Sequence, residues 1–370
     1  MTIYISLFVV LVALTIGELL FAATPNEKRL TFLKNILLTG LIGYMILLLG
    51  NRGFTGTDSY NYYMSYIGRF DNSRLESGYL YLREYSLQQG YNFENFQMLI
   101  AVVTLIPLWL IEILNKNSRF KFLTLLATFT PFFYFAAFNA MRQGVAISFL
   151  LLGFYLYSNR LESKARFLYL LIFGYIASLF HGTAIFLPVI IFGIEFLTRV
   201  TSQKTVQRVK IVAILSVFTA LIVRFNVMNV LLEISGKLGF TYAQRFLYSD
   251  YNTSSFSDLG KIYIVLLLLI YLGLKVINPD SFLQKFEIYL FGVMLIIFAM
   301  VGSANNSMRL MYYFFSFQSI ALPLMIQDYL QGKQYSRALY IFSVLIIFVF
   351  VSFVASLLLN LNGIIPYIGR

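Results

Sequence analysis

A solitary arginine is the residue in this chain whose surroundings most clearly suggest a chemical role. Arg142 is the one charged residue between Lys121 and Arg160, and mostly apolar runs lie on both sides of it. Each run has the length that crosses a bilayer, so the two predict a helical hairpin with Arg142 at its tip. The guanidinium is a planar fork that suits phosphates and carboxylates, and no carboxylate lies nearby in the sequence. We therefore expect an anionic partner from elsewhere in space.

Three other short polar segments carry comparable residues. Arg52 follows the second apolar run, His181 is the only histidine, and Arg309 begins a long apolar run. The predicted topology places all three at the membrane level of Arg142, where converging donors suit a pyrophosphate whose leaving charge must be stabilised without metal. Each also has a plainer interpretation, because a lone histidine is commonly structural and Arg52 could snorkel from a helix end.

Two carboxylates belong to the polar stretch after the second apolar run. Asp58 lies in a Gly-Thr-Asp turn, and Glu76 precedes Ser-Gly-Tyr. The Glu76 carboxylate could take the proton of a sugar hydroxyl as a general base, and the turn brings the Asp58 carboxylate together with backbone N–H groups and Arg52. The alternative roles are structural: Asp58 could cap a helix, and Glu76 could be a solvated partner of Arg74 or Arg83.

The amino-acid composition indicates the class of protein that holds these residues. The 370 residues are 59% hydrophobic and 12% charged, with a mean hydropathy of +0.77. A soluble domain of this size needs more polar surface, so the chain is predicted to be an all-α, polytopic membrane protein. It has no cysteine, a single histidine and no Asp-x-Asp sequence. Thiol chemistry and thiolate or histidine-rich metal centres are therefore excluded, and we expect neither a metal nor a cofactor.

Long apolar segments predict about twelve transmembrane helices in a single integral membrane domain over 1–370. The spans fall near 3–23, 31–50, 96–114, 120–138, 143–158, 167–180, 183–199, 209–229, 261–278, 285–302, 308–327 and 338–359. Two longer polar segments, 51–95 and 230–260, are expected as outer loop segments that could cap a cavity.

Basic residues orient these spans. Most of the 28 lie in alternate short loops on one side, which the positive-inside rule assigns to the cytoplasm. Both termini then face outward, and the outer side holds a set of basic residues dominated by arginine. Within 230–260, Arg245 and Tyr248 are spaced as on one face of a short helix.

The polar motifs resemble those of the EpsG/Wzy-type family of membrane polysaccharide polymerases. They occur in the expected order and span most of the chain. The matching pieces are Arg52-Gly53 with Gly56-Thr57-Asp58 and Tyr60, Tyr62 and Tyr63; Glu76-x-Gly78-Tyr79; Phe138-Asn139-x-x-Arg142-Gln143-x-x-Ala146; Phe180-His181-x-x-Ala184 with Pro188; Arg309 with Tyr312-Tyr313-Phe314; and Pro366-Tyr367.

That resemblance implies a metal-independent glycosyltransferase of GT-C-like architecture. It implies a bacterial plasma (inner) membrane location, with the active site on the outer or periplasmic side. The substrates would be polyprenyl-pyrophosphate-linked oligosaccharide repeats, and the growing chain would pass from its lipid carrier to a new lipid-linked repeat. The lipid bilayer, a flippase and a chain-length regulator are the other expected partners, and no nucleic acid is expected.

Site roles follow from the same resemblance together with the chemistry of the residues. The expected catalytic set is Asp58, Glu76, Arg142 and His181. Asp58 or Glu76 would be the base, with roles that could be exchanged or be structural in both, and His181 would be a ligand or an orienter. Arg142, Arg309 and Arg52 are expected to bind phosphate. The substrate-binding set is Arg52, Gln143, Asn305, Arg309, Tyr312, Arg245 and Tyr248.

Other functions fit parts of the pattern. A flippase or transporter of lipid-linked sugars would need a polar pathway through the midplane, whereas charges within the spans are scarce. An O-antigen ligase would use the same donor with a different acceptor. A membrane acyltransferase would have only His181 as its base.

Overall fold

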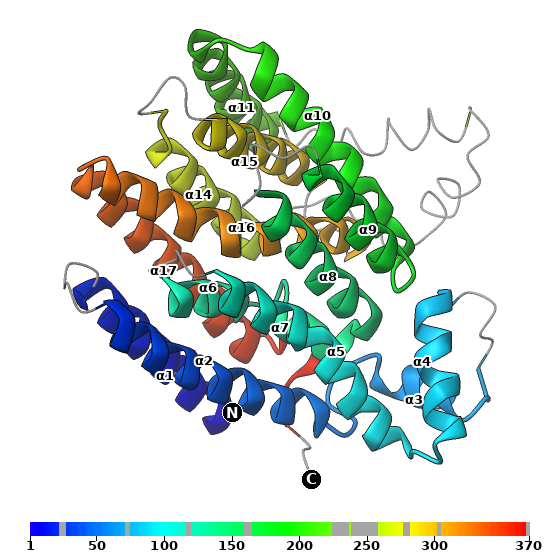
Figure 1. Cartoon of the computed structure of the whole chain (residues 1–370). Coiled ribbons are helices and arrows are strands. Elements are labelled where there is room, and N and C mark those ends of the chain that lie inside the picture. The colour runs from blue at the N-terminus through cyan, green and yellow to red at the C-terminus, as the bar shows by residue number, and fades with distance from the viewer. Residues whose placement is uncertain are drawn as a thin grey trace. The chain divides into compact units, whose positions relative to one another are not determined.

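Helices account for every regular element that the structure describes. The computed structural model describes residues 1–21, 27–70, 75–115, 120–158, 165–223, 237, 258–276, 282–301 and 305–367. Within these ranges there is no strand (Figure 1), which confirms the all-α prediction. Five of the described helices are long and apolar enough to cross a membrane: Thr2–Leu20, Thr31–Gly50, Phe93–Leu114, Gly182–Val200 and Tyr335–Leu358. The chain is thus consistent with a polytopic membrane protein, and about twelve spans stays a prediction.

The chain divides into two compact units. The first comprises Met1–Val189, Ser316–Gln327 and Val349–Arg370, and the second comprises Ile190–Phe315 and Asp328–Phe348. The first unit holds α1 (Thr2–Phe21), α2 (Glu27–Gly50), α3 (Ser59–Tyr66), α4 (Ser77–Gln88), α5 (Phe93–Leu114), α6 (Lys121–Thr128), α7 (Tyr134–Asn139), α8 (Met141–Ser158), α9 (Arg166–Ser178), η2 (Gly182–Ile185) and η3 (Leu361–Gly363).

The second unit is built on α11 (Gln203–Val223), α14 (Asp258–Gly273) and α15 (Phe282–Val301), and α11 packs against α15. Three helices contribute to both units: α10 (Phe186–Val200), α16 (Asn305–Gln331) and α17 (Tyr335–Leu358). In the first unit, α8 packs against both α5 and α9, and α5 packs against α2.

The span expected over 120–138 is not one continuous helix, because two short helices, α6 and α7, occupy it. The break covers 129–133 and contains Pro131. Proline lacks a backbone N–H, and it disfavours helical geometry in the residue before it. Described residues 120–138 are all buried, and irregular backbone is tolerated at membrane depth only where protein covers it. The amide of Asn362 donates to the Pro131 carbonyl at 3.2 Å, so the C-terminal segment meets one of the freed groups.

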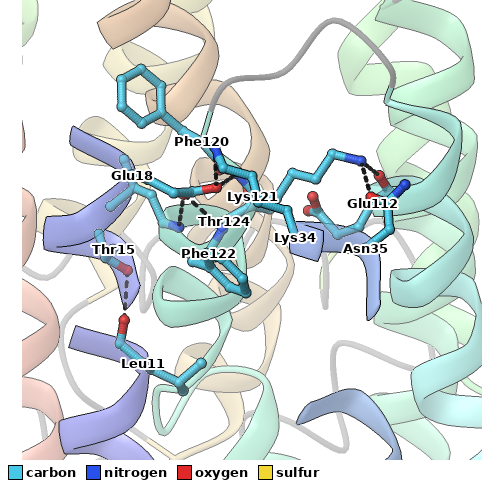
Figure 2. A network of polar contacts seen from close by, with 11 residues as sticks. Leu11, Thr15, Glu18, Lys34, Asn35, Glu112, Phe120, Lys121, Phe122 and Thr124 are labelled. Carbon is cyan, nitrogen blue, oxygen red and sulfur yellow. Dashed lines mark hydrogen bonds and ion pairs between the residues drawn. The ribbon is translucent and has the colours of Figure 1, made fainter. Parts of the chain in front are cut away.

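A carboxylate from α1 holds the beginning of this broken segment (Figure 2). Glu18 accepts hydrogen bonds from the backbone N–H groups of Lys121 at 2.9 Å, Phe122 at 2.8 Å and Leu123 at 3.3 Å. The ammonium of Lys34 lies 3.3 Å from the same carboxylate. The first N–H groups of a helix have no partner inside the helix, and an anion there also interacts favourably with the helix dipole. Glu18 therefore fixes where α6 begins.

The polar stretch 51–95 contains two short helices, α3 and α4, before α5 begins at Phe93. The predicted interruption at His181-Gly182 is also present, since α9 ends at Ser178, η2 follows, and α10 begins at Phe186. Of the second polar stretch, 230–260, only residue 237 and the start of α14 belong to the described residues.

Candidate active site

Arg142 and Glu76 form an ion pair. Arg142 lies in the first turn of α8, and its Nη1 donates to Oε2 of Glu76, 66 residues upstream. Both side chains are 23% exposed. The anionic partner expected for Arg142 is therefore a carboxylate of the same chain. The solvated pairing considered for Glu76 does not involve Arg83, whose guanidinium donates instead to the backbone carbonyls of Ser65 and Tyr66.

Glu76 also contacts the turn that carries His181. Its second carboxylate oxygen, Oε1, accepts a hydrogen bond from the backbone N–H of Gly182 at 3.3 Å. Nearby, the Gly78 N–H donates to the Leu179 carbonyl at 2.7 Å. A Cβ at Gly78 would lie 2.8 Å from that carbonyl oxygen, so a side chain there would force the two segments apart. Glu76 therefore joins Arg142 to the His181 turn.

His181 presents a ring nitrogen to a neighbouring hydroxyl. Its Nδ1 lies 2.8 Å from Oγ1 of Thr183, and the side chain is half-buried. The histidine occupies the extended position just before η2, with the Gly182 N–H that binds Glu76 next to it. Three of the residues predicted to be catalytic, Glu76, Arg142 and His181, are thus brought together by contacts among α4, α8 and the α9–α10 turn.

Asn139 connects Asp58 to the same region. Its Oδ1 accepts hydrogen bonds from the Thr57 hydroxyl and from the Asp58 backbone N–H, both at 2.7 Å. Gly56 makes this close approach feasible. Its φ is +106°, and a Cβ there would lie 2.3 Å from the Phe138 carbonyl oxygen, so only glycine fits. The turn with Asp58 is consequently held against the residues that lead into Arg142.

Both candidate bases occupy N-cap positions, yet neither carboxylate caps its helix. Asp58 precedes α3 and Glu76 precedes α4, and neither makes a side-chain hydrogen bond to the first turn. The capping role considered for Asp58 is therefore not the one seen. The carboxylate of Glu76 turns to Arg142 and Gly182 instead. Asp58 is half-buried, and its backbone N–H contacts Asn139.

Arg52 is buried and hydrogen-bonds to the segment that precedes Arg142. The side chain is fully buried, so it does not snorkel, and its Nη1 donates to the Ala137 carbonyl at 3.1 Å. Nε and Nη2 make no hydrogen bond within the part of the chain that is described. Burial lowers the pKa of Arg52 to about 10, which still leaves it cationic at neutral pH. Its role as a phosphate ligand stays a prediction, and the contact seen is with the segment before Arg142.

Two buried tyrosines, Tyr62 and Tyr79, lie near the ion pair. Burial acts to lower the pKa of Arg142, but Tyr62 and Glu76 outweigh it, so that the pKa is raised overall and the guanidinium stays charged. Tyr62 lies on the buried face of α3, and its ring is 5.8 Å from that of the buried Tyr79. Gln143 is buried in α8 next to Arg142.

The remaining predicted residues are not placed against this cluster. Tyr312 is half-buried in the second unit, as part of α16. Asn305 and Arg309 belong to the first turns of α16, and their side chains lie outside the described residues, as do Arg245 and Tyr248 entirely. Their predicted roles stay predictions.

Sequence reasoning gave no role to several groups that hold the cluster together. The Asn139 amide, the Tyr62 hydroxyl and the Gly182 N–H all interact with a predicted residue. Asn139 had a usable signal, because an amide three residues before a lone arginine marks the same hairpin tip. The Gly182 N–H had none, since every residue except proline offers the same group.

Comparison with known proteins finds one relationship. No curated protein and no solved structure matches the chain. The model of the EpsG family matches residues 35–368, an interval that includes the whole cluster from Arg52 to His181. Because that match covers most of the sequence, the chain belongs to the EpsG family.

Proposed function

We propose that this protein is a membrane polysaccharide polymerase. It transfers a polyprenyl-pyrophosphate-linked glycan chain onto a lipid-linked oligosaccharide repeat at the outer face of the plasma membrane. Membership of the EpsG family supports the reaction class. The observation that carries the proposal is the Arg142–Glu76–Gly182 arrangement, because it is an anion-binding site built from a guanidinium and a backbone N–H.

In this structure the carboxylate of Glu76 occupies that anion site. One oxygen receives the Arg142 guanidinium and the other receives the Gly182 N–H. A phosphate carries more negative charge than a carboxylate and accepts the same kind of hydrogen bonds, so the donor pyrophosphate would replace Glu76 at both groups. The pair is 23% exposed on each side, which leaves a path for this exchange. Arg309 and Arg52 are the further proposed phosphate ligands.

Once the pyrophosphate has displaced it from Arg142, the Glu76 carboxylate is free to accept a proton. The acceptor hydroxyl oxygen forms a bond to the anomeric carbon of the donor sugar, and the bond between that carbon and the pyrophosphate oxygen breaks. The hydroxyl proton passes to a carboxylate, Glu76 or Asp58, and the bonding electron pair leaves with the pyrophosphate. Arg142 stabilises the charge that builds on the leaving group, with His181 as ligand or orienter, and no metal takes part.

The other predicted residues complete the proposal. Gln143, Asn305, Tyr312, Arg245 and Tyr248 would contact the substrate, within a GT-C-like arrangement of about twelve spans. A flippase would supply the lipid-linked repeat, and a chain-length regulator would act on the product.

Complementation of a deletion strain tests the proposal. Arg142→Ala should leave single lipid-linked repeats and no long polysaccharide, while the protein still inserts into the membrane. Arg142→Lys should also be poor, because a point charge does not reproduce the bidentate fork. Arg199→Lys is the matched control for Arg142→Lys, since Arg199 pairs with Glu195 at 2.7 Å in α10. Lysine keeps the charge beside that buried carboxylate, so this variant should behave as wild type.

Long polysaccharide of normal yield from Arg142→Ala would refute the proposal. Long chains that form but stay unattached would indicate a ligase, and a complete absence of glycan at the outer face would indicate a flippase.

A further inference from the structure

The exposed side of α3 and the turn before it carry aromatic rings that the proposed reaction does not use. Tyr60 is 60% exposed, Phe54 is 46% exposed, and Tyr63 is half-buried between them. The ring centroids of Phe54 and Tyr63 lie 5.5 Å apart, and those of Tyr60 and Tyr63 lie 6.5 Å apart. We call Phe54, Tyr60 and Tyr63 the aromatic platform.

Contacts with the buried ring of Phe93 hold the platform in place. Phe93, at the start of α5, stacks on Phe54 with centroids 6.2 Å apart and meets the edge of Tyr63 at 5.5 Å. Phe93 itself is buried, so these contacts belong to the core of the first unit. Rings that are already held in place lose little conformational freedom when a ligand covers them, which favours binding.

The platform adjoins the reacting groups. Asp58 is the N-cap of α3, two residues before Tyr60, and Tyr62 on the buried side of the same helix interacts with Arg142. A helix places residues three or four apart on one side, so Tyr60 and Tyr63 share an edge that Ser59 and Tyr62 do not. A ligand on the platform would therefore lie close to Asp58 at the start of α3, with Tyr62 and Arg142 on the opposite side of the same helix.

The composition of α3 indicates the kind of ligand. The helix reads Ser-Tyr-Asn-Tyr-Tyr-Met-Ser-Tyr, with no Lys, Arg, Leu, Ile or Val. A helix that lies on a membrane surface carries Lys and Arg on its polar face and Leu, Phe or Trp on the other. Tyrosine with Ser and Asn is instead typical of surfaces that bind polar, neutral ligands through ring faces and adaptable hydrogen bonds. The exposed Asn61 follows Tyr60 in α3, and the exposed Thr57 hydroxyl donates to Asn139 and can still accept a hydrogen bond, so both add such groups.

We propose that the aromatic platform binds the sugar rings of a glycan beside the reaction centre. The apolar C–H face of a pyranose would lie on Tyr60 and Phe54, while its hydroxyls meet Thr57 and Asn61. This inference rests on the proposed polymerase function, because it names where that enzyme holds its sugars. The glycan is either the incoming repeat or the end of the growing chain, which share one chemistry.

Binding of pyrophosphate-free sugars tests the platform directly. The probes are oligosaccharides of one and of several repeats, prepared by partial acid hydrolysis of the host's extracellular polysaccharide, titrated into the full-length protein in nanodiscs. Tyr60→Ala and Phe54→Ala should each weaken binding by about tenfold, the order of one lost ring contact. Tyr60→Phe should retain most of the affinity. Tyr81→Ala is the matched control, since Tyr81 is 69% exposed on α4 and should leave binding unchanged.

A kinetic assay separates this inference from the proposed function. With a lipid-linked repeat as substrate, Tyr60→Ala should raise KM and leave kcat near wild type, whereas Arg142→Ala should abolish turnover yet still bind the pyrophosphate-free sugar. If sugar binding depends on Tyr60 but the wild-type protein forms no polymer, the polymerase proposal is refuted, whereas glycan binding by the platform stands.

Equal sugar affinity for wild type and Tyr60→Ala would overturn the inference, and so would an equal loss for Tyr81→Ala. Reduced membrane insertion of Tyr60→Ala with unchanged sugar binding would assign the rings to the membrane interface instead. Equal affinity for short and long probes would assign the platform to a single repeat, and tighter binding of long probes to the growing chain. Either result supports glycan binding.

Discussion

Two carboxylates of the first unit, Glu18 and Glu76, make similar polar contacts in different surroundings. Each accepts hydrogen bonds from a cationic side chain or from backbone N–H groups far away in the sequence. Glu18 receives three N–H groups at the start of α6, and its side chain is 1% exposed beside Lys34. Glu76 receives one guanidinium and one N–H at 3.3 Å, and its side chain is 23% exposed.

The difference explains why one carboxylate is a structural anchor and the other is suited to exchange. The buried Glu18 has its oxygens shared among several fixed donors, so removing it would leave buried N–H groups with no acceptor. The donors of Glu76 are ones that a phosphate also uses, and solvent reaches them. The number of donors and the access of solvent, rather than the residue type, distinguish the two carboxylates.

The largest expected effect is from removing the buried carboxylate. Glu18→Ala should destabilise the protein by about 3–5 kcal/mol, because it leaves the start of α6 uncapped in a buried environment. The folded yield after detergent extraction and the melting temperature measure this loss. Glu76→Ala is the matched control and should cost at most about 1 kcal/mol, as for other partly exposed ion pairs. Equal losses in the two variants would remove the distinction between anchor and exchangeable ligand.

The second prediction separates charge from shape at Glu76. Glu76→Gln should keep the fold but lower the rate of polymer formation by about 10²–10⁴-fold, because an amide is no base. A neutral amide also competes less with a phosphate for Arg142 than a carboxylate does. Inorganic pyrophosphate should bind this variant more tightly than wild type, as measured by calorimetry. Weaker pyrophosphate binding would show that Glu76 helps to hold the phosphate rather than giving way to it.

The third prediction concerns the turn that holds Asp58 against Asn139. Gly56→Ala should abolish most activity, because the new Cβ would collide with the Phe138 carbonyl at a positive φ of 106°. Gly90→Ala is the matched control, since Gly90 has a φ of +70° and nothing within 4 Å of an added Cβ. That control should lose only about 1 kcal/mol of stability, measured by thermal denaturation, and stay active. Full activity of Gly56→Ala would mean that the turn does not position the site.

The smallest effect is expected at Arg52. Arg52→Met should change stability by no more than about 2 kcal/mol, because an apolar side chain of similar size often replaces a buried charge at little cost. Polymer formation should nevertheless fall by about tenfold if the guanidinium positions or binds the substrate phosphate. A folded Arg52→Met protein with the polymerisation rate of wild type would restrict Arg52 to packing.

The fold class followed from the sequence because composition alone requires lipid-facing helices. The break between α6 and α7 did not, since hydropathy is continuous through 120–138 and proline is tolerated elsewhere, as Pro107 is inside α5. Pro131 was the available signal. Its effect depends on the surrounding protein, which must satisfy the backbone groups that the break exposes.

The site was predictable in part for a similar reason. A lone arginine between apolar runs implies an anion, so Arg142 and the need for a partner could be inferred. Which carboxylate pairs with Arg142 could not be inferred, because Glu76 lies 66 residues away in the sequence and is brought to Arg142 by tertiary contacts, among them the docking of α4 on the turn at 179–182. Asn139 was missed as an organiser because one amide at a hairpin tip fits many roles.

Turnover by the purified protein tests the central claim most directly. Wild type and Arg142→Ala, reconstituted in nanodiscs with a lipid-linked repeat and a metal chelator, would be compared by the length of the glycan formed. We predict long chains from wild type and unextended repeats from a folded Arg142→Ala protein. Long chains from Arg142→Ala at the wild-type rate, or a wild-type reaction that stops when metal is removed, would contradict the account.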